Sequence, residues 1–416
     1  MTTIKTLLKN RDLLTLGFSE SISNIGNWIT MMAVFAMVVF RGDGGLLQSS
    51  AIYLAGLLPT LLASPLVGWL VDRVERRRLM VMSEAASGLV IAGLFFTDDF
   101  VWICVLLALQ AVSIAVMSPA RQAVLPQLVA REELTRANAF LQQLNGMVKI
   151  AAPMLAGGLL AALEPRQAIL INVATFGCSA LILSRLPLLP AAQEKTSRES
   201  AAQPAEGGGR VLKGIPGLRL LYGTMFFSVL VLIGFDVIGA VYVRDILQGG
   251  EALMGLLIGL VGAGTLAAGA FLMLSKRRQP RLWRDILLGL GLLACIPLAF
   301  SLAPLLGDAR WMRLLAQAGC LAGGVGNGLL VIQSAVLLQT LTPARWLGRA
   351  GGLLQSVVVA GQIAGIVLTP LLVPAFLKMG SYFLLSALVL ALVGVYSMLS
   401  LKMGQAGQPI LSSERP

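Results

Sequence analysis

The feature that most constrains this chain is a series of twelve apolar runs, each long enough to cross the hydrocarbon core of a bilayer. A spanning helix needs about 20 apolar residues, so twelve helices would use roughly 240 residues. The sequence has 416 residues, which leaves room for short connections and one longer linker. We therefore predict an all-α membrane protein with twelve transmembrane helices.

Charged and turn-forming residues mark the ends of these runs, six of which fall in each half of the chain. The segment between the halves is rich in charge and contains three consecutive glycines, a composition that indicates a linker rather than a core. We expect an N-terminal six-helix bundle at 1–186, a cytoplasmic linker at 187–216 and a C-terminal six-helix bundle at 217–416. The predicted spans are 13–40, 47–71, 79–97, 100–120, 138–163, 167–186, 217–243, 251–275, 285–304, 312–340, 350–377 and 381–402.

Composition excludes a soluble globular protein, because 57% of the residues are hydrophobic and only 12% are charged. The net charge is +12, but the basic residues stand at the ends of apolar runs rather than along one amphipathic face. They therefore indicate membrane topology and not a nucleic-acid surface. Most of them lie inside if both termini are cytoplasmic, so we predict a multi-pass protein of the cell (inner) membrane in that orientation.

The residues that metal sites and enzymes use are scarce. The chain has no histidine, and its four cysteines lie inside apolar runs without C-x-x-C spacing. No clustered carboxylates form a metal or catalytic set, and no phosphate-binding G-x-x-x-x-G-K-[ST] loop occurs. We expect no metal, no cofactor, no enzymatic activity and no ATP-driven pumping by this chain.

A charged segment joins the second and third predicted spans. Residues 68–78 read GWLVDRVERRR, a pattern that predicts a tight turn at the end of an apolar helix. Cationic loops are retained in the cytoplasm, so the arginines place this turn on the inner side of the membrane.

This segment resembles the loop signature G-x-x-x-D-R-x-x-R-R of the major facilitator superfamily, found between that family's second and third helices. The resemblance implies the major facilitator fold and a transporter, with the loop controlling the conformational equilibrium. It also implies that Asp72 holds an inner gate shut by meeting a neighbouring helix N-terminus. The matching residues are Gly68, Asp72, Arg73, Arg76 and Arg77.

A second signature and an internal repeat agree with this assignment. Residues 118–126 read SPARQAVLP and are followed by LTRANA, which resembles the branch of the superfamily that holds enterobactin exporters and macrolide efflux proteins. The sequence AVLPQ at 123–127 recurs as AVLLQ at 335–339, half a chain later. Such a repeat predicts that the two bundles are pseudo-symmetric about an axis along the membrane normal. We expect Pro119 and Pro126 to end the fourth span.

Polar residues inside the predicted spans are candidates for a substrate cavity, because burying them in lipid is costly. The first span carries Glu20, Asn24 and Asn27 at i, i+4 and i+7, which places them on one helical face. Interhelical hydrogen bonding is the structural alternative for the amides. The other cavity candidates are Gln110, Gln142, Asn145, Lys149, Gln355 and Gln362.

Two carboxylates are candidates for carrying a coupling proton. Asp236 stands alone in an apolar stretch of the seventh span, and desolvation favours the neutral form of such a group. Glu20 is the second candidate, and Glu84 lies nearer the cytoplasmic end of its span. Asp236 and Lys149 could pair across the two bundles, as a gate or as a static tie. Many proton-coupled relatives carry arginine where this chain has Gln110, a departure from the pattern of the family's proton relay.

The fifth span carries one further family pattern. Pro153, Ala156, Gly157 and Gly158 resemble the antiporter signature G-P-x-x-G-G, although Ala152 stands where its first glycine belongs. Small residues there allow another helix to approach closely.

These observations predict a monomeric secondary active transporter that works by alternating access. The leading hypothesis is proton-coupled export of a bulky hydrophobic or amphipathic small molecule, such as a drug or a siderophore-like compound. A carrier or flippase for lysophospholipids or other lipid-like substrates from the surrounding membrane is the alternative, and a non-transporting membrane receptor is a further one. The sequence leaves open the substrate, the direction of transport and the coupling ion.

Overall fold

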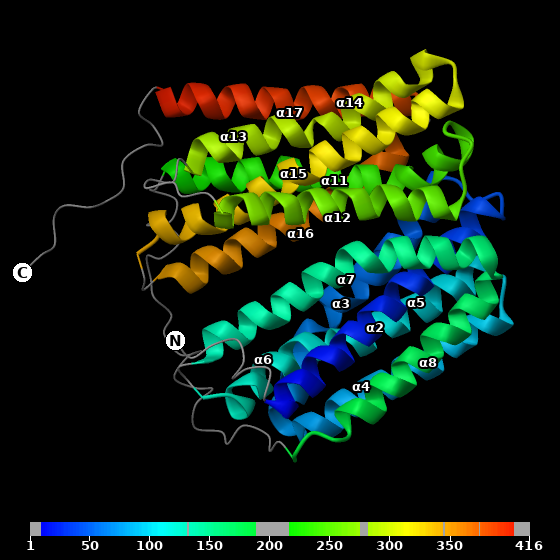
Figure 1. Ribbon diagram of the computed structural model, residues 1–416, viewed down its shortest axis with the longest axis vertical. Helices are drawn as coiled ribbons and strands as arrows, with labels where there is room; N and C mark the ends of the chain where they lie inside the picture. The colour runs from blue at the N-terminus through cyan, green and yellow to red at the C-terminus, as the bar shows by residue number, and fades with distance from the viewer. Residues whose placement is uncertain are drawn as a thin grey trace, which may run out of the picture. The chain divides into compact units, whose positions relative to one another are not determined.

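The chain is almost wholly helical wherever the computed structural model describes it, at 10–130, 133–188, 216–274, 282–343, 346–373 and 375–402 (Figure 1). No β-strand occurs within these ranges. Twelve helices of the described part are long and apolar enough to cross a membrane. The predicted fold class, an all-α membrane protein with twelve spans, is confirmed.

The helix bounds follow the predicted apolar runs to within a few residues. Three spans end in short segments of other helix types: η1 is a π-helix, and η2 and η4 are 3₁₀-helices. The first half contains α2 (Arg11–Phe35), η1 (Ala36–Phe40), α3 (Leu46–Arg73), α4 (Arg76–Gly93), η2 (Leu94–Phe96), α5 (Phe100–Ala115), α6 (Met117–Leu128), α7 (Leu134–Ala162) and α8 (Pro165–Leu183). The second half contains α11 (Pro216–Asp245), α12 (Glu251–Leu274), α13 (Leu282–Leu293), α14 (Cys295–Leu302), η4 (Ala303–Leu306), α15 (Ala309–Leu341), α16 (Leu347–Leu372) and α17 (Met379–Lys402).

The fourth span continues further than its prolines predict. It is interrupted at Val116 and then runs on as α6 to Leu128, so the expectation that Pro119 and Pro126 end it is wrong. Pro119 lies in the first turn of α6, where a backbone N–H has no helical acceptor to lose. Pro126 removes one hydrogen bond only two residues before the helix ends, so little of the helix depends on it.

Contacts divide the chain into two compact units. The first is Met1–Gln203 with Gly249–Gly259, and the second is Pro204–Gln248 with Leu260–Pro416. The start of α12 therefore packs with the first unit. Most of the predicted linker lies outside the described residues, and the predicted domain bounds stay a prediction.

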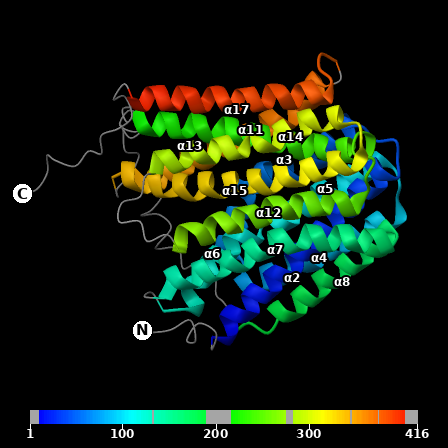
Figure 2. The same ribbon diagram turned by 45° about the horizontal axis from the view of Figure 1, so that its top comes forward.

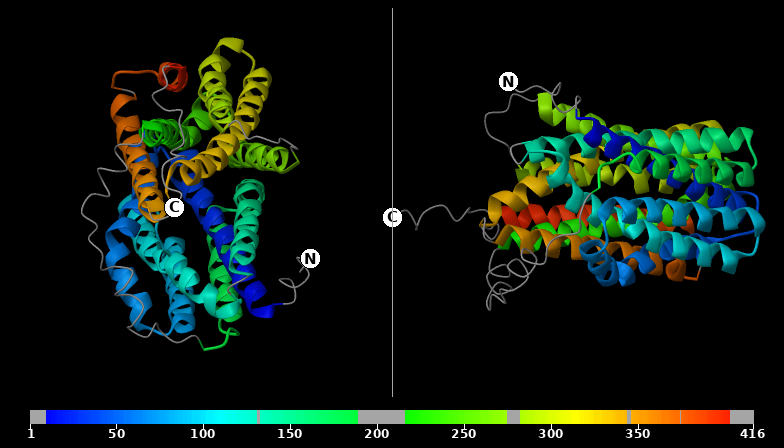
Figure 3. Two further views of the ribbon diagram at one scale, coloured as in Figure 1. Left: turned by 90° about the vertical axis from the view of Figure 1, so that its left-hand side faces the viewer. Right: turned by 90° about the horizontal axis from the view of Figure 1, so that it is seen from below.

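Within the first unit, α2 packs against both α7 and α8, and α4 packs against α5 and α8 (Figures 1 and 3). The helix α3 packs against α5. In the second unit, α13 packs against α15, and α11 packs against α16 and α17, as Figure 2 shows for α11 and α17. Each unit is thus a bundle of helices in direct contact along their sides.

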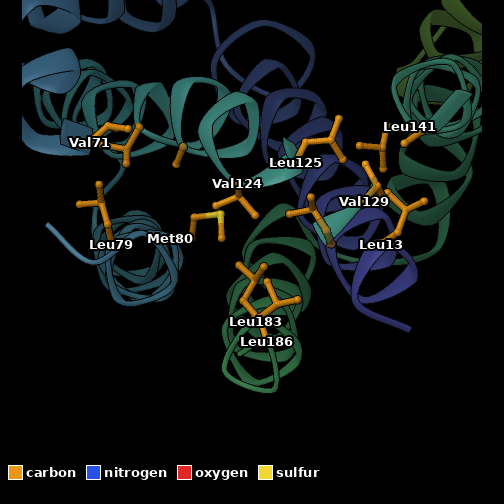
Figure 4. Close-up of a cluster of buried hydrophobic side chains, with 14 of the residues drawn as sticks. Leu13, Val71, Leu79, Met80, Val124, Leu125, Val129, Leu141, Leu183 and Leu186 are labelled. Atoms are coloured by element: carbon orange, nitrogen blue, oxygen red, sulfur yellow. The ribbon is translucent and has the colours of Figure 1, made fainter. Parts of the chain in front are cut away.

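A cluster of buried hydrophobic side chains joins one end of six helices in the first unit (Figure 4). Met80 on α4 and Val124 on α6 are fully buried within it. This cluster fixes the charged turn between α3 and α4 against the rest of the unit. The labelled members are Leu13, Val71, Leu79, Met80, Val124, Leu125, Val129, Leu141, Leu183 and Leu186.

Two methionines on α4 allow a matched test of this cluster. Met80 is fully buried, whereas Met82, two residues later, is 65% exposed. We expect Met80→Ala to lower the free energy of unfolding by about 2 kcal/mol or more, because truncation leaves a cavity. Met82→Ala should change it by less than about 0.5 kcal/mol. Reversible unfolding of both variants in detergent measures the difference, and equal effects would contradict the packing shown in Figure 4.

Candidate functional site

The first unit contains a cavity of about 160 Å³, which we call the polar cavity because eight of its ten lining residues are polar. It lies beside the face of α2 that carries Glu20, Asn24 and Asn27, and α4 contributes Glu84. Helical periodicity brings the three α2 residues to one side, as the sequence predicts. The remaining lining residues are Ser23, Ser83, Ser87, Ile114, Met117 and Ser118.

Glu20 is paired with an arginine. The Nη1 atom of Arg121 lies 3.4 Å from both carboxylate oxygens of Glu20, and both side chains are largely buried. An unpaired charge near the middle of a membrane costs about 3 kcal/mol, so this pairing offsets much of the cost of placing each group there.

A chain of amide hydrogen bonds extends from the same carboxylate. Asn145 on α7 donates from Nδ2 to Oε1 of Glu20 at 3.2 Å. Asn24 donates to Oδ1 of Asn145 at 3.1 Å. In a separate bond, Gln110 on α5 donates to Oδ1 of Asn27 at 3.0 Å. Five of the residues predicted to line a cavity are therefore brought together by the first unit, where they connect α2 to α5 and α7.

Glu84 is the most buried carboxylate of this cavity, with only 4% of its surface exposed. Its Oε2 atom is fully buried and has no hydrogen-bond partner among the described residues. The hydroxyl groups of Ser23 and Ser179 lie beside the carboxyl group, within hydrogen-bonding reach. Ser179 in turn shares a 2.7 Å hydrogen bond with Ser19. Glu84 thus lies among hydroxyl groups, with one carboxyl oxygen to which no described residue hydrogen-bonds.

The arginines of the charged turn fasten α4 to its neighbours. Arg76 is buried and donates from Nη1 to the carbonyl oxygen of Ala123 at 3.0 Å. Arg77 donates to the carbonyl oxygen of Leu186 at 2.9 Å, just beyond the end of α8. Carbonyl groups at helix C-termini lack intrahelical partners and attract cations.

The rest of the turn is described only in part. The guanidinium group of Arg73 stacks on the Trp69 ring, 4.5 Å from its centroid. The surroundings of Gly68 and the side chain of Asp72 lie outside the described part of the chain, so the gating role of the turn stays a prediction.

The remaining predicted site residues are not part of the polar cavity. Gln142 and Lys149 are exposed on α7, and neither hydrogen-bonds to Asn145 or Glu20 within the described part of the chain. In the second unit, Asp236 on α11 is partly buried, and no described residue of that unit hydrogen-bonds to its carboxyl group. Gln355 and Gln362 lie on α16, where the first is exposed and the second is half-buried. The pairing of Lys149 with Asp236 stays a prediction.

The glycines of the antiporter-like signature bring α7 very close to the start of α12. A Cβ atom added to Gly157 would lie 2.7 Å from the carbonyl oxygen of Glu251 and 3.1 Å from the Cα atom of Gly255. A Cβ atom on Gly158 would meet nothing within 4 Å. Only the first of the two adjacent glycines is therefore required for this contact.

Arg41 lies beside this contact between α7 and α12 and joins three segments there. It forms ion pairs with Glu164 at 2.7 Å and with Glu251 at 3.1 Å, and it donates to the carbonyl oxygen of Leu160. One guanidinium group thus joins the residue after η1, the connection between α7 and α8, and the first residue of α12. Its multiple donors suit this role better than a single ammonium group would.

The sequence prediction missed Arg121 as a partner in this site and assigned Glu84 only a minor place. The predicted span of 100–120 stops one residue before Arg121, whereas α6 continues to Leu128 and includes it. A signal was present, since Gln110 and Arg121 are eleven residues apart, close to three full helical turns. No group of three or more Cys, Asp or Glu residues gathers within the described part of the chain.

Comparison with known proteins assigns the family. The model of the Major Facilitator Superfamily matches residues 16–366. This chain belongs to the major facilitator superfamily. It is 28% identical over 415 residues to the multidrug efflux pump Tap of Mycolicibacterium fortuitum, a match that covers 93% of this chain and 95% of Tap. It is 29% identical over 224 residues to macrolide efflux protein A of Streptococcus pyogenes, covering 52% of this chain and 55% of that protein.

A solved major facilitator structure has the same fold. A bacterial homologue of the human lysosomal transporter Spinster, in an inward-facing and occupied conformation, aligns with a TM-score of 0.68 at 14% identity. The alignment covers 95% of this chain and 98% of that one. The predicted resemblance to macrolide efflux proteins is confirmed, and this major facilitator is a multi-pass membrane protein of a transporter family.

The two adjacent glycines of α7 provide a matched pair of variants for the contact with α12. We expect Gly157→Ala to separate the two helices, since the new methyl group meets backbone atoms, at a cost of about 1–3 kcal/mol. Gly158→Ala has open space and should leave them in place. Distances between spin labels on α7 and α12, in a background without the four native cysteines, measure the separation. An unchanged distance in Gly157→Ala would contradict the close approach.

Proposed function

We propose that this major facilitator is a secondary active transporter that exports a bulky hydrophobic or amphipathic small molecule by alternating access, in exchange for protons. The observation that carries the proposal is the nearly full-length similarity to a multidrug efflux pump in a chain whose first unit holds a buried Glu20–Arg121 pair. Charged groups inside membrane helices are costly and usually serve a transport pathway. Energy from a gradient fits a chain without a nucleotide-binding loop.

We assign different roles to Asp236 and Glu20 because their surroundings differ. Asp236 has no hydrogen-bond partner among the described residues of its unit, so it can exchange a proton without breaking a network. Glu20 is held by Arg121 and Asn145, so binding a proton there would disturb both contacts. Asp236 is therefore the first candidate for the coupling proton and Glu20 the second. The exposed ammonium group of Lys149 would favour neutral or anionic substrates.

The orientation and partners follow from the same proposal. Both termini lie in the cytoplasm of a cell whose inner membrane holds the protein, because that arrangement places most basic residues inside. The protein works as a monomer with membrane lipid around it. The arginine-rich turn, with Asp72 and Arg73, controls the balance between conformations rather than the affinity for substrate.

Purified protein in proteoliposomes tests this function directly. A panel of erythromycin, ethidium, enterobactin and lysophosphatidylcholine is first screened for thermal stabilisation of the protein. Transport of each stabilising compound is then measured with and without an imposed pH gradient. We expect a gradient-dependent flux of a drug-like compound. Transport of lysophosphatidylcholine alone would identify a lipid carrier instead, and transport that ignores the pH gradient would remove the proton coupling.

Replacing Asp236 tests the assignment of the proton. We expect Asp236→Asn to abolish transport driven by the pH gradient while leaving substrate binding and passive exchange largely intact, because asparagine cannot carry a proton. Asp245→Asn, near the end of the same helix and ion-paired with Arg244, is the control and should transport normally. Gradient-driven flux that persists in Asp236→Asn would move the coupling role to another group.

A further inference from the structure

The polar cavity of the first unit is too small for the substrate proposed above. Its volume is about 160 Å³, whereas pockets for drug-sized ligands measure about 300–1,000 Å³. Most of its lining residues are also polar, whereas a hydrophobic compound is expected to need a mostly apolar set. The cavity therefore suits a different kind of occupant, one with the size of a few water molecules.

The atoms around the cavity define the chemistry of that occupant. Apart from the guanidinium group of Arg121, the polar side chains that line or border it are carboxylates, hydroxyls and amides, with no imidazole or thiolate. Oxygen ligands of this kind suit hard cations. The free, fully buried Oε2 atom of Glu84 supplies an acceptor that no described residue satisfies. A buried acceptor without a partner is costly, and a cation would supply the missing interaction.

The charges around Glu84 indicate the valence of a cation that would occupy the cavity. Glu20 on α2 is the second carboxylate, and Arg121 on α6 neutralises it in an ion pair. The neighbouring helix α5 has no charged residue, and the only charged residue of α8, Arg166, is in its first turn and is ion-paired with Asp98. An ionised Glu84 would therefore be the one carboxylate of the cavity without an ion-pair partner among the described residues. A monovalent cation restores neutrality, whereas a divalent ion would leave an excess positive charge.

We propose that Glu84, with the hydroxyl groups of Ser23 and Ser179, forms a binding site for one monovalent cation inside the first unit. The cation is either a proton on the Glu84 carboxyl group or a sodium ion held by its free oxygen. The binding itself stands on the cavity alone. Its use in transport rests on the proposed function, in which it would be a second coupling site besides Asp236.

Thermal stability of the purified protein in detergent tests this binding without any transport. Sodium is titrated against choline at constant ionic strength and fixed pH, and the pH is then varied at constant sodium. A few degrees of stabilisation by sodium at fixed pH identifies the sodium ion. Stabilisation by acid alone, with an infrared band of a protonated carboxyl group, identifies the proton. Wild-type protein that responds to neither would overturn the proposal.

The neutral variant Glu84→Gln assigns the response to this residue. Glutamine has nearly the same shape without the charge, so the variant should be as stable as cation-bound wild type and should no longer respond to the cation. Its infrared spectrum should lack the protonated-carboxyl band. Glu133→Gln removes a carboxylate at the start of α7, outside the cavity, and should respond as wild type does. An unchanged cation response in Glu84→Gln would overturn the assignment.

A second variant keeps the test decisive if Glu84→Gln does not fold. Ser23→Ala removes one hydroxyl group near the carboxyl group and is small enough to preserve packing. It should weaken sodium binding several-fold, or shift the midpoint of the acid response. An unchanged midpoint would overturn the role of the hydroxyl groups. These outcomes differ from a failure of the proposed function, because protein that binds the cation without pH-driven flux retains the site and loses only the proton coupling.

Discussion

The first unit depends on the rule that polar groups inside a membrane must satisfy one another. Lipid offers no hydrogen bonds, so each buried carboxylate or amide determines which helix lies beside it. The Glu20 carboxylate accepts from Arg121 and Asn145, and Gln110 donates to Asn27. These contacts connect α2 to α5, α6 and α7. Apolar packing alone would not select these neighbours, because the lipid is as apolar as the helices are.

The fold could be predicted from the sequence because a span is a local property. Whether about 20 consecutive residues are apolar does not depend on what lies nearby, and all twelve spans were found. The error at Pro119 is also local in origin. Proline is a strong signal for the end of a helix, but its effect depends on its position within the turn. Pro119, in the first turn of α6, does not end the helix. The predicted span nevertheless stops just after this proline and so leaves Arg121 outside the helix.

The candidate site could be predicted only in part. Periodicity placed Glu20, Asn24 and Asn27 on one face, since helical spacing fixes that relation within α2. It could not identify what faces them, because partners on α4 and α6 are chosen by packing between helices. The fourth span has no arginine at position 110, but it carries one elsewhere. Arg121 lies three turns further along the same span and brings a positive charge to Glu20 from there.

The helix α2 also connects the polar cavity to the contact at its far end. Glu20 and Asn27 line the cavity, and the same helix continues through η1 to Arg41. Arg41 in turn binds Glu164 and Glu251, beside the close approach of α7 and α12. Gly157, where an added Cβ would meet the backbone of α12, lies at the same end of the unit. One continuous span, α2 with η1, therefore carries the polar residues of the cavity and leads directly to the arginine that joins the far ends of α7 and α12.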